Sequence, residues 1–436
     1  MFATILQTLD EIFFLLLSIS VILLLYKIFY HIYGLFPTKR FPTAKTQHKF
    51  AILVPARNES KVIGKLLQSF ADGDYPTDRF DVYVIVESAD DPTVEIVKKF
   101  PFATTFVRPN LNVKTKGAAL DQVLRHLLST GIAAAKDYEA YFIFDADNYV
   151  APNYLTEMNN VFDAGYDIAL GYRNALNWND GWVASCSALT FSMINTFQNK
   201  CRARFAQNVL VSGTGFYITA GIINALGGWP FQTLTEDAEI SYYATLHNLR
   251  GAYNEYAEFW DEQPKSLRIS CSQRLRWVKG YLQVNKKYHK SMLKSIRSSK
   301  TQRLGKVEFI MNIIPVLVPL VSIILYSLAT LTMGIVGVCT GVLSTLWIQA
   351  FFNCGVALLG CYLFFEAYAA LMLAVEHRRN NLTLWHAITT CLMFPFFMAL
   401  YVPIAIIALF KRQVVWTQIE HCPTELPTTK EKSDAQ

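Results

Sequence analysis

The stretch Y-F-I-F-D-A-D-N-Y-V, residues 141–150, decides how this chain is interpreted. It begins as an apolar run that is typical of a buried strand and continues into Asp145 and Asp147, two carboxylates on alternate positions. Side chains two apart on a strand share a face, so both carboxylates point into one small region. Two like charges repel each other there unless something positive lies between them. The pattern therefore predicts a divalent cation at the end of a strand.

The surrounding segment, residues 46–300, alternates short apolar runs with longer amphipathic runs. This alternation predicts an α/β fold with a parallel sheet that is covered by helices on both faces. In such sheets ligands bind beyond the carboxyl ends of the strands, where this chain has polar side chains. The expected strands are 50–56, 81–87, 103–108 and 141–147, and the expected helices include 59–72 and 116–130.

The composition points to a membrane. Hydrophobic residues make up 52% of the 436 residues and charged residues 17%, which is apolar for a wholly soluble protein. The excess lies in residues 11–36 and 309–410, whose apolar runs are long enough to cross a bilayer. Lys39 and Arg40 follow the first run, so the positive-inside rule places the central segment in the cytoplasm. The expected parts are an N-terminal transmembrane anchor at 1–37, a cytoplasmic domain at 46–300, transmembrane helices at 307–412 and a polar tail at 413–436.

The number of crossings stays open. Three downstream spans, 309–332, 344–374 and 385–410, would leave the C-terminus outside, whereas Lys411 and Arg412 favour the inside. Two interpretations resolve the conflict: one segment lies in the membrane interface, or a fourth crossing lies between residues 328 and 350.

The sequence also disfavours several other functions and kinds of site. The basic stretch at residues 286–306 suits anionic lipid headgroups, and because membrane-flanking cytoplasmic segments commonly carry such clusters, we expect no nucleic-acid partner. The eight cysteines show no C-x-x-C pairing, so we expect neither a disulfide framework nor a zinc site. A G-x-G-x-x-G or Walker-type loop is missing, which disfavours dinucleotide oxidoreductases and P-loop ATPases.

A second acidic motif, T-E-D-A-E, occupies residues 235–239. It has two interpretations. Thr233 and Glu236 have capping-box spacing, and acidic residues are favoured in a first helical turn, so the motif can be a plain helix start. Alternatively, Asp237 is a general base that removes a proton from an attacking hydroxyl. A carboxylate at a helix N-terminus tends to a low pKa, so burial or the neighbouring Glu236 and Glu239 would have to raise the pKa of Asp237.

A third motif, Q-R-L-R-W, precedes the basic stretch. In a ligand site, Arg276 would pair with phosphate, Gln273 would hydrogen-bond to it and Trp277 would stack on a sugar ring. The alternative is a membrane-interface anchor, because Arg and Trp are common at that position.

Taken together and in this order, the motifs resemble the membrane-integrated family 2 glycosyltransferases, the group that contains cellulose, hyaluronan and poly-N-acetylglucosamine synthases. The resemblance covers about residues 50–285 and the membrane layout, and its ordered set of motifs is far more specific than any one of them. It implies a GT-A fold, with a mixed and mostly parallel sheet, inserted between transmembrane helices. The motifs are P-A-R-N-E, the strand-end Glu87, K-G-A-A-L, D-A-D-N, S-G-T-G-F, T-E-D-A-E and Q-R-L-R-W.

The resemblance also implies roles for individual residues. Asp147, with Asp145, looks like a Mg²⁺ or Mn²⁺ site, Asp237 looks like the catalytic base, and Trp277 and Glu236 look like acceptor contacts. Glu87 departs from the family pattern, since many relatives carry aspartate there. The implied nucleotide and diphosphate contacts are Glu59, Glu87, Lys116, Asp145, Gln273 and Arg276.

The implied activity is inverting, metal-dependent transfer from a nucleotide sugar, usually UDP-linked, to a glycan or glycolipid acceptor. The resemblance places it at the cytoplasmic face of a bacterial-type cytoplasmic membrane, where the enzyme would elongate a polysaccharide. Because a growing glycan cannot cross lipid unaided, an accessory export protein or a homo-oligomer would contribute to the exit path. The alternatives are transfer of one sugar to a membrane lipid, as ceramide glucosyltransferases do, and a membrane scaffold that retains an inactive transferase fold.

Overall fold

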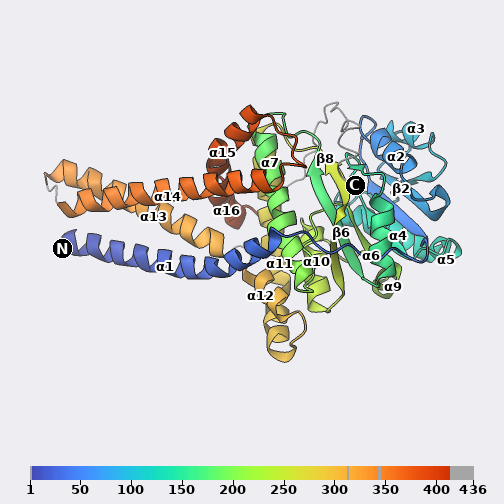
Figure 1. Cartoon of the computed structure of the whole chain (residues 1–436), viewed down its shortest axis with the longest axis horizontal. Coiled ribbons are helices and arrows are strands. Elements are labelled where there is room, and N and C mark those ends of the chain that lie inside the picture. Colours follow the sequence, from blue (N-terminus) through green and yellow to red (C-terminus); the bar gives the residue numbers. More distant parts are fainter. Residues whose placement is uncertain (1, 312–313, 342–344, 413–436) are drawn as a thin grey trace.

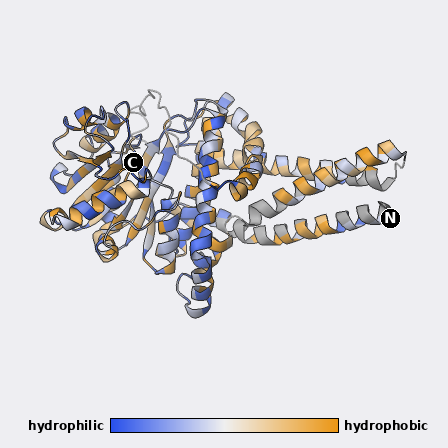
Figure 2. Cartoon of the chain, turned by 180° about the vertical axis from the view of Figure 1, so that it is seen from behind, coloured by the Kyte–Doolittle hydropathy of each residue, from blue (hydrophilic) through white to orange (hydrophobic). Residues whose placement is uncertain are grey.

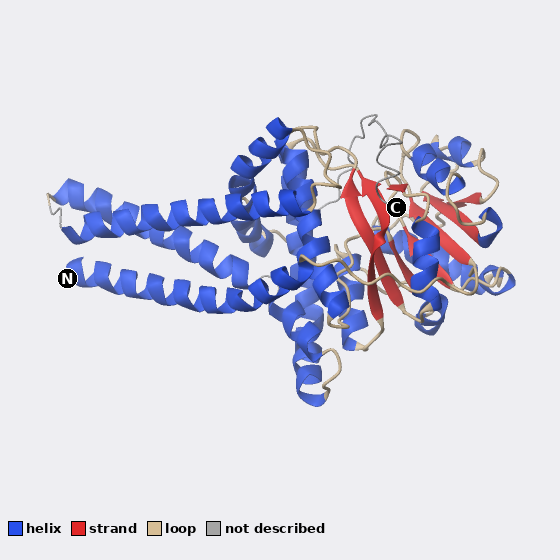
Figure 3. Ribbon diagram, in the orientation of Figure 1, coloured by secondary structure: helices blue, strands red, loops and turns tan. Residues whose placement is uncertain are grey.

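The computed structural model describes residues 2–311, 314–341 and 345–412, so the expected polar tail at 413–436 lies outside the described residues. A sheet-containing domain lies at one end of the molecule, and three long helices extend away from it (Figure 1). Figure 3 shows that every strand belongs to this one domain. In the sequence, helices α1 and α13 to α16 lie on either side of the segment that forms this domain, and the predicted division into a cytoplasmic domain and transmembrane parts stays a prediction.

The domain is built on one sheet, which has eight strands in the described residues in the order β3-β2-β1-β4-β7-β6-β8-β5. β7 is antiparallel to both β4 and β6, and β5 is antiparallel to β8, whereas the other pairs are parallel. The sheet is therefore mixed and mostly parallel, as expected. The strands are β1 (Phe50–Pro55), β2 (Phe80–Val86), β3 (Ala103–Val107), β4 (Ala140–Ile143), β5 (Tyr149–Val150), β6 (Ile168–Ala175), β7 (Phe216–Thr219) and β8 (Gly251–Asp261).

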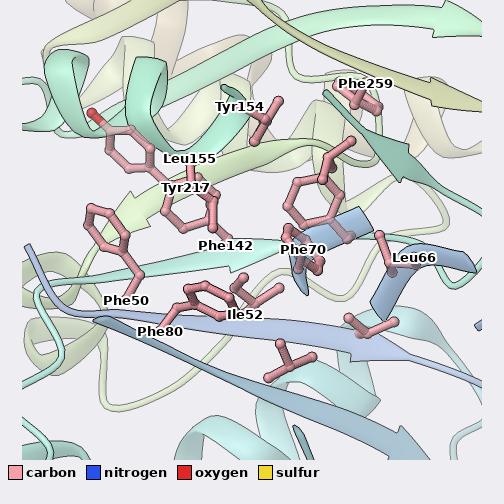
Figure 4. Close-up of a cluster of buried hydrophobic side chains, with 14 of the residues drawn as sticks. Phe50, Ile52, Leu66, Phe70, Phe80, Phe142, Tyr154, Leu155, Tyr217 and Phe259 are labelled. Carbon is pink, nitrogen blue, oxygen red and sulfur yellow. The ribbon is translucent and has the colours of Figure 1, made fainter. Parts of the chain in front are cut away.

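Both faces of the sheet are buried. Alternate residues of β1, a strand inside the sheet, pack in two different hydrophobic clusters. Phe50 and Ile52 of β1 pack in one cluster, part of which is drawn in Figure 4, whereas Ala51 and Leu53 pack in another. This burial on both sides explains why the strands are near-continuous apolar runs. The helices of the domain are α2 (Ile63–Ala71), α3 (Thr93–Val97), α4 (Lys116–Ser129), α5 (Ile132–Ala135), α6 (Tyr154–Asp163), α7 (Trp182–Met193), α8 (Lys200–Arg204), α9 (Ala220–Leu226) and α10 (Glu236–Leu246), with a short 3₁₀ turn η1 (Thr77–Arg79) and a π-helix η2 (Ile194–Asn199).

Three long helices form what we call the helix bundle: α1 (Phe2–Gly34), α13 (Ile314–Thr340) and α14 (Thr345–Val375). Each contacts the other two, and Figure 2 shows apolar residues along them. The amphipathic α11 (Leu267–Ser298) lies where the bundle meets the domain, and α12 (Arg303–Met311) follows it. By length and composition, the described residues contain two stretches that could cross a membrane, Phe351–Val375 and Leu384–Phe410.

The last apolar stretch is divided into α15 (Leu384–Ala399) and α16 (Tyr401–Phe410), and it lies at the base of the bundle (Figure 1). α15 packs on α7, and α16 packs on α11. Arg274 of α11 donates to the carbonyl of Phe397 over 2.7 Å, and Lys279 donates to the carbonyl of Ala408 over 2.9 Å. These contacts attach the stretch to the sheet domain, whereas the bundle extends away from it.

Candidate active site

A cavity of about 530 Å³ lies beyond the carboxyl ends of the central strands, where the sheet domain meets α7, α11 and α16. Groups from residues 59 to 277 therefore meet in one place, as the sequence interpretation requires. Their individual roles stay predictions. Every residue that was assigned a role from the sequence lines this cavity: Glu59, Glu87, Lys116, Asp145, Asp147, Glu236, Asp237, Gln273, Arg276 and Trp277.

Asp145 and Asp147 are not on the strand, which corrects the geometry that we expected. β4 ends at Ile143, and both aspartates lie in the turn that follows. The turn replaces the sheet ladder because side chains satisfy the backbone: the Asp145 amide donates to Thr214 Oγ1 over 2.9 Å and to Asn148 Oδ1 over 3.1 Å. Both aspartates still line the same cavity, so the turn achieves the convergence that strand alternation was expected to give.

The positive charge expected beside the aspartates includes a lysine of this chain. Lys116 is the first residue of α4, and its Nζ lies 2.5 Å from Asp145 Oδ1 and 2.7 Å from the carbonyl oxygen of Gly213. Gly213 has φ of +89°, a conformation that other residues rarely adopt, so the glycine-rich turn is needed to present this carbonyl. Lys116 therefore ties the D-x-D turn to the S-G-T-G-F turn.

The residues present fit a divalent ion that binds together with a substrate. Asp147 is partly exposed on the cavity wall, and the Asn148 amide group lies 3.3 Å from its Oδ1. Within the described part of the chain, no group of three or more His, Cys, Asp or Glu side chains is placed to hold a metal. Magnesium and manganese sites of this kind use one or two carboxylates and take their other ligands from substrate phosphates and water.

The second acidic motif is both a helix start and a part of the cavity. α10 begins at Glu236, and its N-cap is Thr235, which makes no side-chain capping bond. The proposed capping box does not form, because the Thr233 amide donates to Glu239 Oε2 over 2.9 Å. The helix-start interpretation is therefore right about the position and wrong about the capping partner.

Burial governs the ionisation of this motif. It raises the pKa of Glu236 to about 7, with a further contribution from the neighbouring Asp237 carboxylate. Burial also raises the pKa of Asp237, although the Ala238 amide, Arg276 and Lys116 act in the opposite direction. The low pKa that a helix N-terminus favours is thus outweighed by desolvation. A buried carboxylate with a raised pKa has the property that a general base needs.

The Q-R-L-R-W motif lies on α11, opposite α10. Arg276 donates to the carbonyl of Leu234 over 3.0 Å, and the Trp277 ring meets Phe191 of α7 edge to face, with ring centres 5.7 Å apart. The two helices approach closely at Gly280, where a Cβ atom would lie 2.5 Å from Thr235 Oγ1. The motif faces the cavity, so its residues have a place in the site in addition to any anchoring role.

The nucleoside end proposed for Glu87 contains cations that the sequence interpretation did not assign. Arg57 Nε lies 3.2 Å from Glu87 Oε2, and Arg108 NH1 lies 3.8 Å from Oε1. Arg108 is buried, which lowers its pKa, while Glu87 acts in the opposite direction. Arg57 belongs to the quoted P-A-R-N-E motif, and Arg108 follows β3, so the search for polar residues at strand ends could have found both.

A second missed pair, Arg173 and Asp261, comes from the ends of β6 and β8. Arg173 Nε donates to Asp261 Oδ2 over 3.0 Å, and its NH1 donates to the carbonyl of Ser212 over 2.6 Å. The guanidinium carbon lies 3.6 Å from the centre of the Phe191 ring. Burial raises the pKa of Asp261, and Arg173 opposes this shift. These residues follow the strand-end rule too, but β6 and β8 were not among the expected strands.

Comparisons with known proteins agree with this arrangement. Residues 48–280, a little over half of the chain, match the family described as Glycosyltransferase like family 2. The chain is 27% identical over 289 residues to the probable glycosyltransferase YdaM of Bacillus subtilis, covering 62% of this chain and 66% of the relative. It is 25% identical to a beta-monoglucosyldiacylglycerol synthase of Trichormus variabilis, and the match covers 61% of this chain and 56% of the relative. It is also 25% identical to glucomannan 4-beta-mannosyltransferase 7 of Arabidopsis thaliana, and the match covers 52% of this chain and 42% of the relative. The chain thus spans less than two thirds of the length of these relatives.

The fold has a solved counterpart. The mannosyltransferase PcManGT from Pyrobaculum calidifontis, in complex with GDP-Man and Mn²⁺, superimposes with a TM-score of 0.54 and is 16% identical, over 95% of this chain and 100% of that chain. The identity is too low to say more than that the two share a fold, which is GT-A-like and α/β. With a family match over more than half of its residues and this fold, the chain is a member of Glycosyltransferase like family 2.

Proposed function

We propose that this enzyme is an inverting glycosyltransferase that moves a sugar from a nucleotide sugar, preferably a UDP-sugar, to a hydroxyl group of a membrane lipid. The observation that carries the proposal is the single cavity in which the D-x-D pair, the buried Asp237 and the Q-R-L-R-W motif meet. These groups supply the three requirements of sugar transfer: a cationic site for a diphosphate, a base for the acceptor and a surface for the acceptor body.

The donor would lie along the strand-end side of the cavity. Glu59 and Glu87 would bind the nucleoside, and Lys116 and Arg276 would bind the diphosphate as charged hydrogen-bond donors. Asp147, with Asp145, would hold Mg²⁺ or Mn²⁺, whose charge stabilises a leaving diphosphate. PcManGT, which shares the fold, was solved with GDP-Man and Mn²⁺, so the base of the nucleotide has to be tested rather than assumed.

The acceptor would be activated by Asp237. Its carboxylate accepts the proton of the acceptor hydroxyl, and the hydroxyl oxygen forms the new bond to the anomeric carbon. The bond from that carbon to the phosphate oxygen breaks on the opposite face, and its electron pair leaves with the nucleoside diphosphate. Attack from the face opposite the leaving group inverts the anomeric configuration.

The acceptor end of the cavity favours a lipid over a free sugar. Its wall combines four aromatic side chains from α7, α11 and the start of α16: Phe191, Trp277, Tyr281 and Tyr401. One wall residue, Tyr401, begins α16, an apolar helix at the base of the bundle. A lipid headgroup could therefore reach the cavity while its chains stay in the bilayer. The similarity to a beta-monoglucosyldiacylglycerol synthase supports the same choice.

The membrane arrangement follows from the packing. We place α1, α13 and α14 across the bilayer and α15 with α16 in the interface, because α15 packs on both α14 and α7 and α16 packs on α11, which puts the pair between the bundle and the sheet domain. Three crossings with a cytoplasmic sheet domain put Lys411 and Arg412 on the cytoplasmic side, as the positive-inside rule favours. The exposed lysines of α11, such as Lys286, Lys290 and Lys294, would then meet anionic headgroups of the cytoplasmic leaflet.

Polysaccharide elongation is the second candidate. Two observations favour it: the similarity to a glucomannan mannosyltransferase, and the position on the cavity wall of Gln273, Arg276 and Trp277, which form the Q-x-x-R-W element that the family resemblance links to processive members. In that case the glycan would need an exit path, to which an export partner or a second copy of the chain would contribute.

One experiment separates the candidates. The purified full-length chain in detergent is supplied with Mn²⁺, a panel of radiolabelled UDP-sugars and GDP-Man, and either a lipid extract or oligosaccharides. One chloroform-soluble product that forms only with lipid supports the proposal, whereas a ladder of water-soluble products supports elongation. Transfer from none of the donors would contradict both. Trp277→Ala should raise the acceptor KM and leave the donor KM unchanged, because Trp277 is assigned to the acceptor alone.

A further inference from the structure

A buried group of charged and polar side chains joins the helix bundle to the sheet domain. Glu376 and Arg379 follow the last residue of α14, whereas Lys200 comes from α8 and Glu255 from β8. Lys200 Nζ lies 2.7 Å from Glu255 Oε2 and 4.0 Å from Glu376 Oε1, and Arg379 lies within 3.9 Å of both carboxylates. Glu258 is a further buried carboxylate that interacts with Arg379, so the two cations lie among three carboxylates. We call the following residues the junction cluster: Tyr172, Thr196, Lys200, Glu255, Glu376 and Arg379.

Both α1 and α14 of the bundle reach this cluster. The hydroxyl of Thr38, shortly after α1, donates to Glu255 Oε1 over 3.0 Å, and its amide donates to the same oxygen. Lys200, Glu255 and Glu376 are each less than 10% exposed. Buried ion pairs are a poor source of stability, because desolvating the charges costs about as much as the pairing returns. Their best-attested use is to favour one arrangement of structural elements over others. We infer that here they fix the position of the helix bundle relative to the sheet domain.

The cluster contacts a π-helix that also lines the cavity. Glu376 Oε1 accepts from Thr196 Oγ1 of η2, and Glu376 Oε2 accepts from the Tyr172 hydroxyl over 3.0 Å. Ile194 and Gln198 of the same π-helix line the cavity. π-helices are rare and occur often at functional sites. η2 therefore has the bundle junction on one side and the candidate active site on the other.

From η2, two buried asparagines reach the cavity wall. Asn195 Nδ2 donates to the carbonyl of Arg173 over 2.7 Å. Asn199 binds the backbone of Leu210 twice: its Oδ1 accepts from the amide over 2.8 Å, and its Nδ2 donates to the carbonyl over 3.1 Å. Both asparagines are at most 1% exposed, so none of these three bonds can be replaced by bulk water without opening the core.

The segment that Asn199 holds carries two carbonyl groups of the donor site. Residues 210–213 line the cavity. The carbonyl of Ser212 binds Arg173, and the carbonyl of Gly213 binds Lys116, which also contacts Asp145. A series of buried and partly buried hydrogen bonds, joined by η2 and the 210–213 segment, therefore runs from the end of α14 to the cations of the candidate active site.

We propose that Glu376 is a positioning residue, which acts through Thr196 and η2 to hold the 210–213 wall in the geometry that binds the donor. The expected effect on the donor KM rests on the proposed nucleotide-sugar function. The expected effect on the structure of the 210–213 wall does not. This role of Glu376 makes donor binding depend on the position of the bundle relative to the sheet domain. The bundle would then affect the donor site without contacting the donor.

The first test compares two substitutions of one residue in the full-length chain. Thr196→Val keeps the shape of the side chain and removes the hydroxyl, whereas Thr196→Ser keeps the hydroxyl. A hydrogen bond to a charged group is worth enough that we expect Thr196→Val to raise the donor KM about tenfold, with a smaller change in kcat. Thr196→Ser should keep the wild-type donor KM. Equal donor KM values for the two variants would overturn the proposal.

The second test compares the same substitution, Glu to Gln, at two positions ten residues apart. Glu376→Gln removes the junction carboxylate, and Glu366→Gln removes a carboxylate ten residues earlier in α14. Only Glu376→Gln should raise the donor KM. The double variant Thr196→Val/Glu376→Gln should be no worse than the poorer single variant, because both changes interrupt one series of bonds. Effects that multiply, or a donor KM that rises equally in the control, would contradict the coupling.

The third test does not depend on any substrate. Amide hydrogen exchange of a peptide covering residues 205–215 should be faster in Thr196→Val than in Thr196→Ser, at equal melting temperatures. Unchanged exchange overturns the positioning role whatever the enzyme transfers. If exchange responds but the wild-type chain transfers sugar from no donor, the proposed function fails and the structural coupling stands.

Discussion

The ammonium group of Lys116 lies 2.5 Å from Asp145 Oδ1 and 2.7 Å from the carbonyl of Gly213. One lysine thus joins the D-x-D turn after β4 to the glycine-rich turn before β7. The contact gives Asp145 a positive partner from the chain itself, and Arg173 interacts electrostatically with both Asp145 and Asp147.

Lys116→Met should weaken donor binding. The substitution removes a charged hydrogen bond, worth about 1.5 to 3 kcal/mol, and leaves Asp145 repelling the diphosphate. We expect the dissociation constant of UDP in the presence of Mn²⁺, measured by calorimetry, to rise about tenfold or more. Lys98→Met is the control, because Lys98 pairs with the exposed Glu95 and is not among the residues that line the cavity. Equal affinities of the two variants would remove Lys116 from the donor site.

Asp147→Asn should abolish the response of nucleotide binding to metal. An amide oxygen is a weaker ligand for Mg²⁺ or Mn²⁺ than a carboxylate, so added Mn²⁺ should no longer strengthen UDP binding. Asp72→Asn is a matched control, because Asp72 belongs to the chain's other D-x-D pattern, D-G-D, which follows α2 at the surface. A variant at Asp147 that still responds to Mn²⁺ like the control would rule out the predicted metal role.

Asp237→Asn should retain nucleotide and lose transfer. A general base contributes about 10²- to 10⁴-fold, so kcat should fall by that order while the UDP dissociation constant stays close to that of the wild type. Asp78→Asn, at a largely exposed side chain outside the cavity, serves as the control for handling and folding. Unchanged turnover would show that Asp237 is not the base.

The acid limb of the pH profile should move when Arg276 is removed. Burial raises the pKa of Asp237, and Arg276 is one of the cations that lower it. The base must be ionised, so kcat/KM rises with pH and levels off above this pKa. Arg276→Leu should raise the pKa and displace the limb to higher pH, whereas Arg125→Leu, from an exposed pair on α4, should leave it in place. A displacement to lower pH would contradict the electrostatic assignment.

Glu236→Gln should change how stability depends on pH. The pKa of Glu236 is raised to about 7 by burial and by Asp237, from 4.5. Between these values the folded state keeps a proton that the unfolded state has released, so this contribution to stability is lost as pH rises. We expect the melting temperature of Glu236→Gln, relative to that of the wild type, to increase from pH 5 to pH 8. A constant difference would show that Glu236 is not a buried acid with a raised pKa.

The sequence by itself determined the class of fold and brought ten candidate residues to one cavity. Apolar runs of strand length with polar residues after them predict a parallel sheet whose ligands bind at one edge, because strand direction brings those ends together. That reasoning singled out Glu87, Asp145 and Asp147, whereas Asp237 was singled out as a candidate base by the T-E-D-A-E motif and by the family resemblance. The same rule would have found Arg173 and Asp261 had β6 and β8 been recognised, but both strands include polar residues within their length.

Only the tertiary structure decided what depends on burial and on distant partners. The raised pKa of Asp237 comes from desolvation by elements that are far away in the sequence, and local spacing predicted the opposite shift. The contact of Lys116 with Asp145 and the bond between Thr196 and Glu376 join residues 29 and 180 positions apart. Local patterns specify helices and strands because those are set by neighbouring residues, whereas charge pairing and solvent exclusion depend on which surfaces meet when the chain folds.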